Sequence, residues 1–314
     1  MEIPSNLKNI VDLIFSKSPL QKKKIMGFLL NKDASFLAEA EEFSIEYIDY
    51  LKDQDIPLSY AVDAYIKMCN DMVRSQISFM KTGKYPREEA GRAFDEVYNN
   101  DEEMKSYMIG LAMSQFLWPT HNEMYAFFKK NLNSYSDSIS SYLEIGPGHG
   151  LFLRAAMKRL SNNNASIAVI DISQTSIITT KSIMEFFFRE KSSEISYKNI
   201  DILNFDSSEK YDFVTMGEVL EHVNYPEKLL NKIRELLSEK GKAFISTCVD
   251  CPTIDHVYHF TSVDSIRNMF SKCGLTIVTD GVLPVENLEM EEIIKKKITI
   301  NYCAIVMKKS HEEI

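Results

Sequence analysis

Apolar residues recur every three or four positions through the first 130 residues of the chain. Ala61, Tyr65, Met68 and Met72 form one such stripe after Pro57, a residue type that favours the first turn of a helix. The same spacing predicts helices over 5–17, 19–31, 36–51, 87–98 and 102–131, with a further helix after Pro57. Because period-two runs typical of strands are missing here, this half is predicted to be all-helical.

The pattern changes after a small, polar stretch at 133–138. Short apolar runs then alternate with helix-like segments near 150–161, 174–190, 226–239 and 262–273. The runs are SYLEI, SIAVID, YDFVTM and KAFIST, with a further strand near 195–200. This alternation predicts an α/β fold with a doubly wound, mostly parallel sheet, and strand-like segments at 275–279 and 298–307 predict a closing hairpin with an antiparallel strand. We therefore divide the chain into a helical domain, 1–134, and an α/β domain, 135–314.

Composition narrows the class of protein. With 45% hydrophobic and 26% charged residues, the 314-residue chain is typical of a folded protein, and its net charge of −9 argues against a nucleic-acid partner.

The first ten residues lack the pattern of a secretory leader, and no apolar run is long enough to span a bilayer, so we expect a cytoplasmic protein without a membrane partner. Five scattered cysteines, an odd number, are expected to be reduced thiols.

The most informative segment is a glycine-rich turn between the first predicted strand of the α/β half and the next helix. Gly146, Gly148 and Gly150 are spaced by two, which matches neither the dinucleotide fingerprint nor a P-loop. Glu144 precedes the turn, and its carboxylate would repel a pyrophosphate but suits a cationic ligand. The turn therefore favours S-adenosylmethionine over NAD, although a lone glycine turn is often only a tight connection.

Acidic residues follow the next two predicted strands. Asp171 stands where a carboxylate can accept hydrogen bonds from both ribose hydroxyls, and Asp201 with Ile202 stands where adenine can be held. Each acid alone could instead cap a helix N-terminus. The fourth strand leads into Gly217 and Glu218 at the same edge of the sheet.

Together the motifs LEIGPGHG, VID, NID and YDFVTMGEVLEHV resemble the class I S-adenosylmethionine-dependent methyltransferases, in particular their small-molecule, ubiquinone-biosynthesis-like branch. The resemblance covers about residues 135–309. It implies a seven-stranded sheet whose last strand is antiparallel, with S-adenosylmethionine bound across the carboxyl ends of the strands. The cofactor contacts it implies are Glu144, Gly146, Gly148, Gly150, Asp171, Ile172, Asp201, Ile202, Gly217 and Glu218.

By analogy with that family, the helical half is expected to form a lid or a homodimer surface. The segment 107–128 is rich in methionine and aromatic residues, most of which are expected to pack in a core. Polar groups interrupt it, and we expect Gln115, Trp118 and His121 to contact the substrate.

The segment after the fifth strand is expected to enter the substrate side of the cleft. His256 beside Asp255 is our first candidate for a general base, His259 the second, and His222 the third, although His222 could instead pack beneath the cofactor. Tyr258 and His222 are also candidate substrate contacts. These histidines could equally serve only to hydrogen-bond the loop, and methyl transfer to a deprotonated amine needs no base.

Metal binding is the alternative use of the same segment. Cys248, Cys251, His256 and His259 are residue types that zinc accepts. The stretch between the cysteine pair and the histidine pair is far shorter than in a zinc finger, so we expect no metal site.

The reaction that these features favour is methyl transfer from S-adenosylmethionine to an oxygen or nitrogen of a small molecule. One rival is a protein or RNA methyltransferase that recognises its substrate through the helical half. Another is a non-catalytic binding module that uses the fold only as a scaffold.

Overall fold

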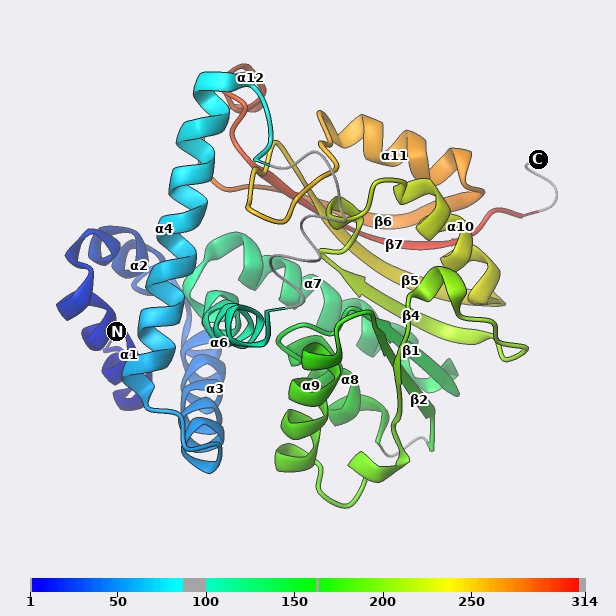
Figure 1. The fold of residues 1–314 in the computed structure, drawn as a ribbon, viewed down its shortest axis with the longest axis horizontal. Helices are drawn as coiled ribbons and strands as arrows, with labels where there is room; N and C mark the ends of the chain where they lie inside the picture. Colours follow the sequence, from blue (N-terminus) through cyan, green and yellow to red (C-terminus); the bar gives the residue numbers. More distant parts are fainter. Residues whose placement is uncertain (1, 87–99, 162–163, 311–314) are drawn as a thin grey trace.

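A computed structural model describes residues 2–86, 100–161 and 164–310. The helical part lies against one side of the α/β part, with α6 (Asp101–Leu117) and α7 (Pro119–Tyr135) between the blue and cyan helices and the sheet (Figure 1). The helix predicted at 87–98 lies outside the described residues. No helix within the described ranges has the length and apolar character needed to cross a bilayer.

The helical part agrees closely with the periodicity of the sequence. Its helices are α1 (Ser5–Lys17), α2 (Lys22–Leu29), α3 (Ala34–Asp53), α4 (Leu58–Thr82), α6 (Asp101–Leu117) and α7 (Pro119–Tyr135), with a 3-10 turn η1 (Pro19–Gln21). The single helix predicted over 102–131 is wrong, because the chain breaks at Trp118 and Pro119. Trp118 is extended, with φ −114° and ψ 128°, as expected for a residue before proline, and Pro119 starts the new helix.

The α/β part contains a seven-stranded sheet in the order β3-β2-β1-β4-β5-β7-β6. Its strands are β1 (Ser141–Ile145), β2 (Ser166–Asp171), β3 (Ser196–Asn199), β4 (Tyr211–Gly217), β5 (Leu237–Val249), β6 (Leu275–Pro284) and β7 (Ile300–Lys308). Strands β1 to β5 pair in parallel, whereas β7 runs antiparallel to both β5 and β6. The predicted sheet and its antiparallel last strand are confirmed.

Helices cover both faces of this sheet. The α/β part contributes α8 (Leu151–Leu160), α9 (Gln174–Phe187), α10 (Pro226–Leu236), α11 (Val263–Lys272) and α12 (Met290–Lys295), with turns η3 (Ser136–Ser138), η4 (Ser192–Glu194), η5 (Ile202–Asn204) and η6 (Leu220–His222). Helices α8 and α9 share a core with one face of the sheet, and α10 and α11 share a core with the other. The helix predicted to reach residue 239 ends at Leu236, because Leu237 already pairs with Tyr211.

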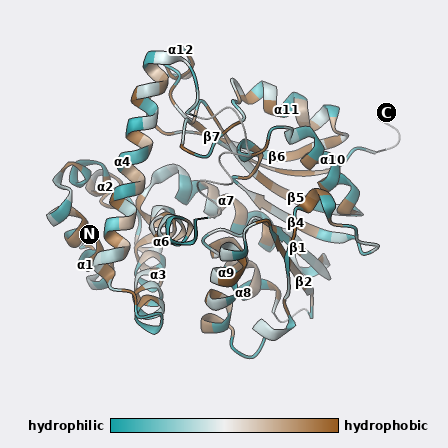
Figure 2. Cartoon of the chain, viewed as in Figure 1, coloured by the Kyte–Doolittle hydropathy of each residue, from teal (hydrophilic) through white to brown (hydrophobic). Residues whose placement is uncertain are grey.

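The core of the helical part continues onto the sheet through α7. Phe128 of this helix contacts Phe152 of α8 and Phe244 of β5, at ring-centroid distances of 4.9 and 5.1 Å. Hydrophobic colouring runs along the strands of the sheet, while α4 carries both colours (Figure 2). Because α7 anchors the helical part to the sheet, the helices stand next to the carboxyl ends of the parallel strands.

The crossing of α4 and α6 gives a stability prediction. A Cβ atom on Gly110 would lie 2.8 Å from the backbone carbonyl carbon of Ala64, so we expect Gly110→Ala to destabilise the protein by about 1–3 kcal/mol through overpacking. Gly27→Ala is the matched control, because a Cβ there meets nothing within 4 Å, and it should stabilise by about 0.5–1 kcal/mol. Urea unfolding of both variants measures the difference. A Gly110→Ala protein as stable as the parent would contradict the close helix crossing.

Candidate active site

A cavity of about 1310 Å³ lies between the carboxyl ends of the strands and the helices α4, α6 and α7. Its strand side is formed by residues that follow β1, β2, β3, β4 and β5. Its helical side is rich in methionine: Met72, Met80, Met104, Met108 and Met124. The fold thus joins a polar strand edge to a largely apolar helical wall.

The glycine turn after β1 takes the backbone conformation that glycine permits. Gly146, Gly148 and Gly150 have φ of 65°, 50° and 71°, in the left-handed region. A Cβ on Gly146 would come within 2.8 Å of the Val219 side chain. Gly146 and Gly148 line the cavity, whereas Gly150 forms the N-cap of α8 outside its lining.

Glu144 lies behind this turn rather than in the cavity wall. Its side chain is buried, and one carboxylate oxygen accepts a hydrogen bond of 2.5 Å from the hydroxyl of Tyr142. The other oxygen, Oε1, has no hydrogen-bond partner among the described residues. Burial raises the pKa of Glu144 to about 8. Any effect of this group on a ligand therefore passes through the glycine turn.

Asp171 ends β2 and lines the cavity. Its carboxylate accepts hydrogen bonds from the backbone N–H of Ser173, at 2.7 Å, and from the hydroxyl of Ser176, at 2.6 Å. Burial raises the pKa of Asp171 to about 6, against the opposing effect of these hydrogen bonds. The two serines fix the orientation of the carboxylate at the cavity wall.

The neighbouring strand ends complete this side. Asp201, Ile202 and Ile172 all line the cavity. Asp201 also caps the short turn η5, because its side chain accepts from the backbone N–H of Leu203 at 2.9 Å. The capping role and the cavity position, which the sequence left as alternatives, therefore coexist in one residue.

Gly217 and Glu218 line the cavity at the end of β4. Glu218 has a φ of 53°, unusual for a residue other than glycine, and its backbone N–H donates to Ser246. Burial and the nearby Glu221 carboxylate raise the pKa of Glu218 well above its usual range. Its Oε1 has no hydrogen-bond partner among the described residues. This strained corner thus presents a carboxyl group with one unsatisfied oxygen beside the cavity.

The helical wall contains the three residues that the sequence indicated. Gln115, Trp118 and His121 line the cavity, as does His149 of the glycine turn. The hydroxyl of Ser114 lies 2.7 Å from Nδ1 of His121, and burial lowers the pKa of His121 to about 3. His121 is therefore neutral at physiological pH.

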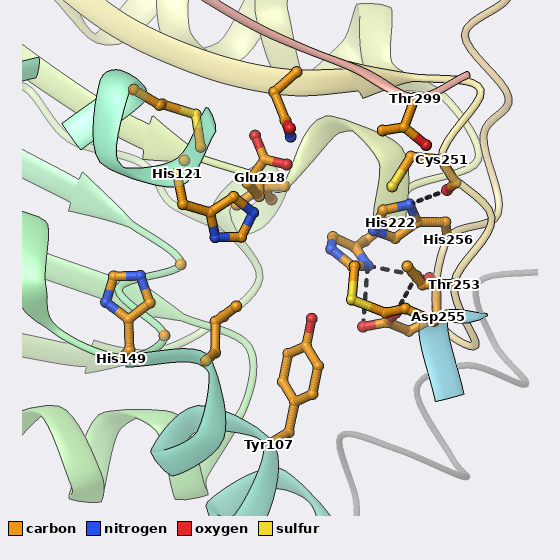
Figure 3. A pocket seen from close by; sticks show the side chains of 18 of the residues that line it. Tyr107, His121, His149, Glu218, His222, Cys251, Thr253, Asp255, His256 and Thr299 are labelled. Carbon is orange, nitrogen blue, oxygen red and sulfur yellow. Dashed lines mark hydrogen bonds and ion pairs between the residues drawn. The ribbon is translucent and has the colours of Figure 1, made fainter. Parts of the chain in front are cut away.

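The loop after β5 forms the opposite wall (Figure 3). Asp255, His256 and His222 line the cavity together. Nδ1 of His222 lies 3.1 Å from the backbone oxygen of Asp255 and 3.5 Å from its carboxylate. The rings of His222 and His256 meet edge to face at 4.7 Å. A histidine held by a carboxylate in a cavity wall is an arrangement suited to proton transfer.

His256 has a different electrostatic environment. Burial would lower its pKa, but the Cys251 thiol and the Glu221 and Asp255 carboxylates outweigh it and raise the pKa to about 10. The hydrogen bond with the Cys248 thiol and, after it, the contact with His256 lower the pKa of the Cys251 thiol to about 5, which favours a thiolate and imidazolium pair. A protonated imidazole cannot accept a proton, so this environment does not favour His256 as the general base.

Two further residues indicated by the sequence lie outside the cavity lining. Nε2 of His259 lies 2.6 Å from the Asp250 carboxylate, and its ring stacks on Tyr85. The ring of Tyr258 packs against Phe260.

Several cavity residues were not indicated by the sequence as site residues. They include Tyr107, His149, Thr253, Thr299 and Asn301. Figure 3 shows the Tyr107 hydroxyl directed between the two histidine-bearing walls. The sequence could have indicated His149 as a site residue, because it lies between two glycines of the turn. No sequence pattern indicates the other residues, because they reach the cavity only through tertiary packing.

The raised pKa of Asp171 predicts a pH-dependent affinity. Below its pKa the carboxyl group is protonated and loses capacity to accept hydrogen bonds, including those from the ribose hydroxyls that the sequence predicts as its partners. We expect the Kd for S-adenosylhomocysteine to be constant above pH 7 and to rise about tenfold for each pH unit below about 6. Isothermal titration calorimetry across this range measures it, with Asp171→Asn as control. A parent protein whose affinity is flat down to pH 5 would contradict this assignment.

Comparison with known proteins agrees with this geometry. The fold and the strand-edge cavity define an α/β domain of the kind that binds ligands at the carboxyl ends of its parallel strands. A family model described as a methyltransferase domain matches residues 120–280, slightly more than half of the chain. The chain therefore belongs to the methyltransferase-domain family, and its cofactor is S-adenosylmethionine.

Similar curated proteins are ubiquinone biosynthesis O-methyltransferases. The mitochondrial enzyme of Candida albicans is 33% identical over 132 residues, which are 41% of this chain and 37% of that enzyme. The enzyme of Coxiella burnetii is 31% identical over 132 residues, 41% of this chain and 52% of its own length. This chain thus spans about a third to a half of these relatives. Among solved structures, the N-methyltransferase NodS from Bradyrhizobium japonicum is 18% identical, with a TM-score of 0.48 over 69% of this chain and 98% of that chain.

Proposed function

We propose that this protein transfers the methyl group of S-adenosylmethionine to an oxygen atom of a small, largely apolar molecule. The observation that carries the proposal is the cavity, which joins the cofactor edge of the sheet to a methionine-rich wall. Oxygen is favoured over nitrogen because the curated relatives are O-methyltransferases.

The residues at the strand edge fit the cofactor. Gly146 and Gly148 allow close approach to the backbone, because glycine has no side chain and adopts the left-handed conformation of the turn without strain. The oriented Asp171 carboxylate would accept from the ribose, and Asp201 with Ile202 would hold the adenine. When bound, S-adenosylmethionine supplies an activated methyl group on a sulfonium centre and a neutral thioether leaving group.

The helical wall would determine which acceptors enter. Met104, Met108 and Met124 present flexible apolar side chains, which adapt to the shape of an apolar substrate. We propose that the helical residues 1–134 act as the wall and lid of the acceptor site. A concave cavity lined in this way accommodates a small molecule more readily than a folded protein or RNA.

His222 is our candidate for the proton acceptor. Its Nδ1 faces the Asp255 backbone oxygen and carboxylate, which orient the ring, and Nε2 would take the proton of the acceptor hydroxyl. Asp255 is itself held by the hydroxyl of Thr253, at 2.7 Å. This pairing replaces the first choice from the sequence, His256, which the raised pKa does not favour as a base.

Labelled S-adenosylmethionine tests the proposal. The purified protein is incubated with methyl-labelled cofactor and a fractionated small-molecule extract, and the products are separated by mass. Label in a low-mass, ether-linked product is expected. Label only in protein or RNA would instead indicate a protein or RNA methyltransferase. No labelled product in any fraction would favour a non-catalytic binding module.

A further inference from the structure

Two cysteines and a histidine meet in the wall of the cavity next to the proposed acceptor site. Cys248 lies near the end of β5, and Cys251 and His256 follow in the next loop. All three are buried, with exposed fractions of 1%, 8% and 5%. One candidate ligand atom from each lies within 4.8 Å of the other two.

One distance in this cluster matches the spacing of ligands in a tetrahedral metal site. A zinc ion bonded to sulfur at 2.3 Å and to nitrogen at 2.0–2.1 Å requires ligand atoms about 3.5–3.8 Å apart. The Sγ atom of Cys248 lies 3.7 Å from Nδ1 of His256. Ligands at this spacing need only small shifts to enclose an ion.

The loop is rigidly held in this shape. Asp250, between the two cysteines, has a φ of 49°, in the left-handed region, and this closes the turn. Its backbone oxygen accepts from the hydroxyl of Thr299 at 2.9 Å, and its carboxylate lies 2.6 Å from His259. His259 therefore stabilises the turn that brings Cys248 and Cys251 together, although it lies outside the cluster.

A buried carboxylate stands on the far side of His256. Oε1 of Glu221 has no hydrogen-bond partner among the described residues and lies 4.0 Å from Nε2 of His256. Its other oxygen is held by the hydroxyl of Thr247, at 2.7 Å. Metal-binding histidines almost always donate their second N–H to such a group, which fixes the tautomer and the ring orientation. With a metal on Nδ1, the proton of the imidazole would stay on Nε2, the nitrogen that faces Oε1 of Glu221.

We propose that Cys248, Cys251 and His256 bind one zinc ion. The ion replaces the present 2.7 Å contact between His256 Nδ1 and the backbone oxygen of Cys251. Two thiolates and an imidazole form a donor set that selects zinc over magnesium or calcium. Cys251 and His256 line the cavity, so the fourth position accepts water or an oxygen donor from that side. The expectation of no metal rested on finger spacing, which does not apply to a site closed by one loop.

Metal analysis tests this directly, without reference to activity. The full chain is purified without a histidine tag, dialysed against excess zinc and then metal-free buffer, and its metal is measured by mass spectrometry. About one zinc per chain is expected in the parent, and Cys248→Ser and Cys251→Ser should each lower this at least about tenfold. Cys273→Ser is the matched control, since Cys273 is equally buried but contacts the backbone oxygen of Glu227 instead.

Cobalt substitution and a conservative variant complete the test. Cobalt in the parent should give thiolate charge-transfer absorption that the Cys273→Ser protein keeps and the Cys251→Ser protein loses. If a cysteine variant fails to fold by circular dichroism, Glu221→Gln should fold and still lower zinc affinity about 10–100-fold. Parent protein without zinc after dialysis, or zinc content unchanged by the cysteine and Glu221 variants, overturns the proposal.

Discussion

Replacing His222 by glutamine is expected to lower kcat by about 10²–10⁴-fold, the usual contribution of a positioned general base. The reason is that glutamine keeps the size and polarity of the side chain but cannot take the proton of a hydroxyl acceptor. Cofactor affinity should stay within a few-fold, because the base acts on the acceptor. Turnover with labelled S-adenosylmethionine and calorimetry with S-adenosylhomocysteine measure the two quantities separately.

The control for His222 is His259. His259→Gln changes a histidine outside the cavity lining, and glutamine can still donate a hydrogen bond to Asp250, so this variant should keep kcat within a few-fold of the parent. The defect of His222→Gln should also shrink as the pH rises toward the pKa of the acceptor hydroxyl, since an ionised acceptor needs no base. A His222→Gln enzyme with near-parental kcat at neutral pH would remove His222 from the chemistry.

The architecture could be predicted because hydrophobic periodicity reports burial directly. Strands such as 166–171 and helices such as 5–17 were recognised within a residue or two, since each buries one continuous apolar run or stripe. The predicted helix bounds were wrong at two points, where local chemistry overrides the hydrophobic periodicity. Pro119 split an apparently continuous helix, and the polar start of β5 was read as the end of a helix although Leu237 pairs with Tyr211.

The candidate site was predictable only where topology alone positions a residue. Asp171 and Asp201 stand at the ends of neighbouring parallel strands, and such ends meet at one edge of the sheet. Glu144 lies one residue before the end of β1, so the alternation of the strand turns its side chain toward Tyr142 and away from the cavity. The loop after β5 was harder, because periodicity does not reveal which of its histidines turns inward.

Removing the Asp171 carboxylate is expected to weaken binding of S-adenosylhomocysteine by about 10²-fold or more. The carboxylate would accept two ribose hydroxyls, and each hydrogen bond to a charged group contributes about 1.5–3 kcal/mol, where 1.4 kcal/mol is tenfold in Kd. Ser173 and Ser176 already hold the group in place, so little reorganisation offsets this gain. Isothermal titration calorimetry of Asp171→Ala at pH 7.5 measures the loss.

A ligand lacking the hydroxyls distinguishes lost hydrogen bonds from a damaged fold. The 2′,3′-dideoxy analogue of S-adenosylhomocysteine should bind the parent and the Asp171→Ala protein with similar Kd, because it presents nothing for the carboxylate to accept. Asp206→Ala is the matched control, since the Asp206 side chain is 99% exposed and outside the cavity, and it should leave both affinities unchanged. An equal loss of affinity for the natural and the dideoxy ligand in Asp171→Ala would mean that Asp171 shapes the turn through Ser173 and Ser176 without contacting the ribose.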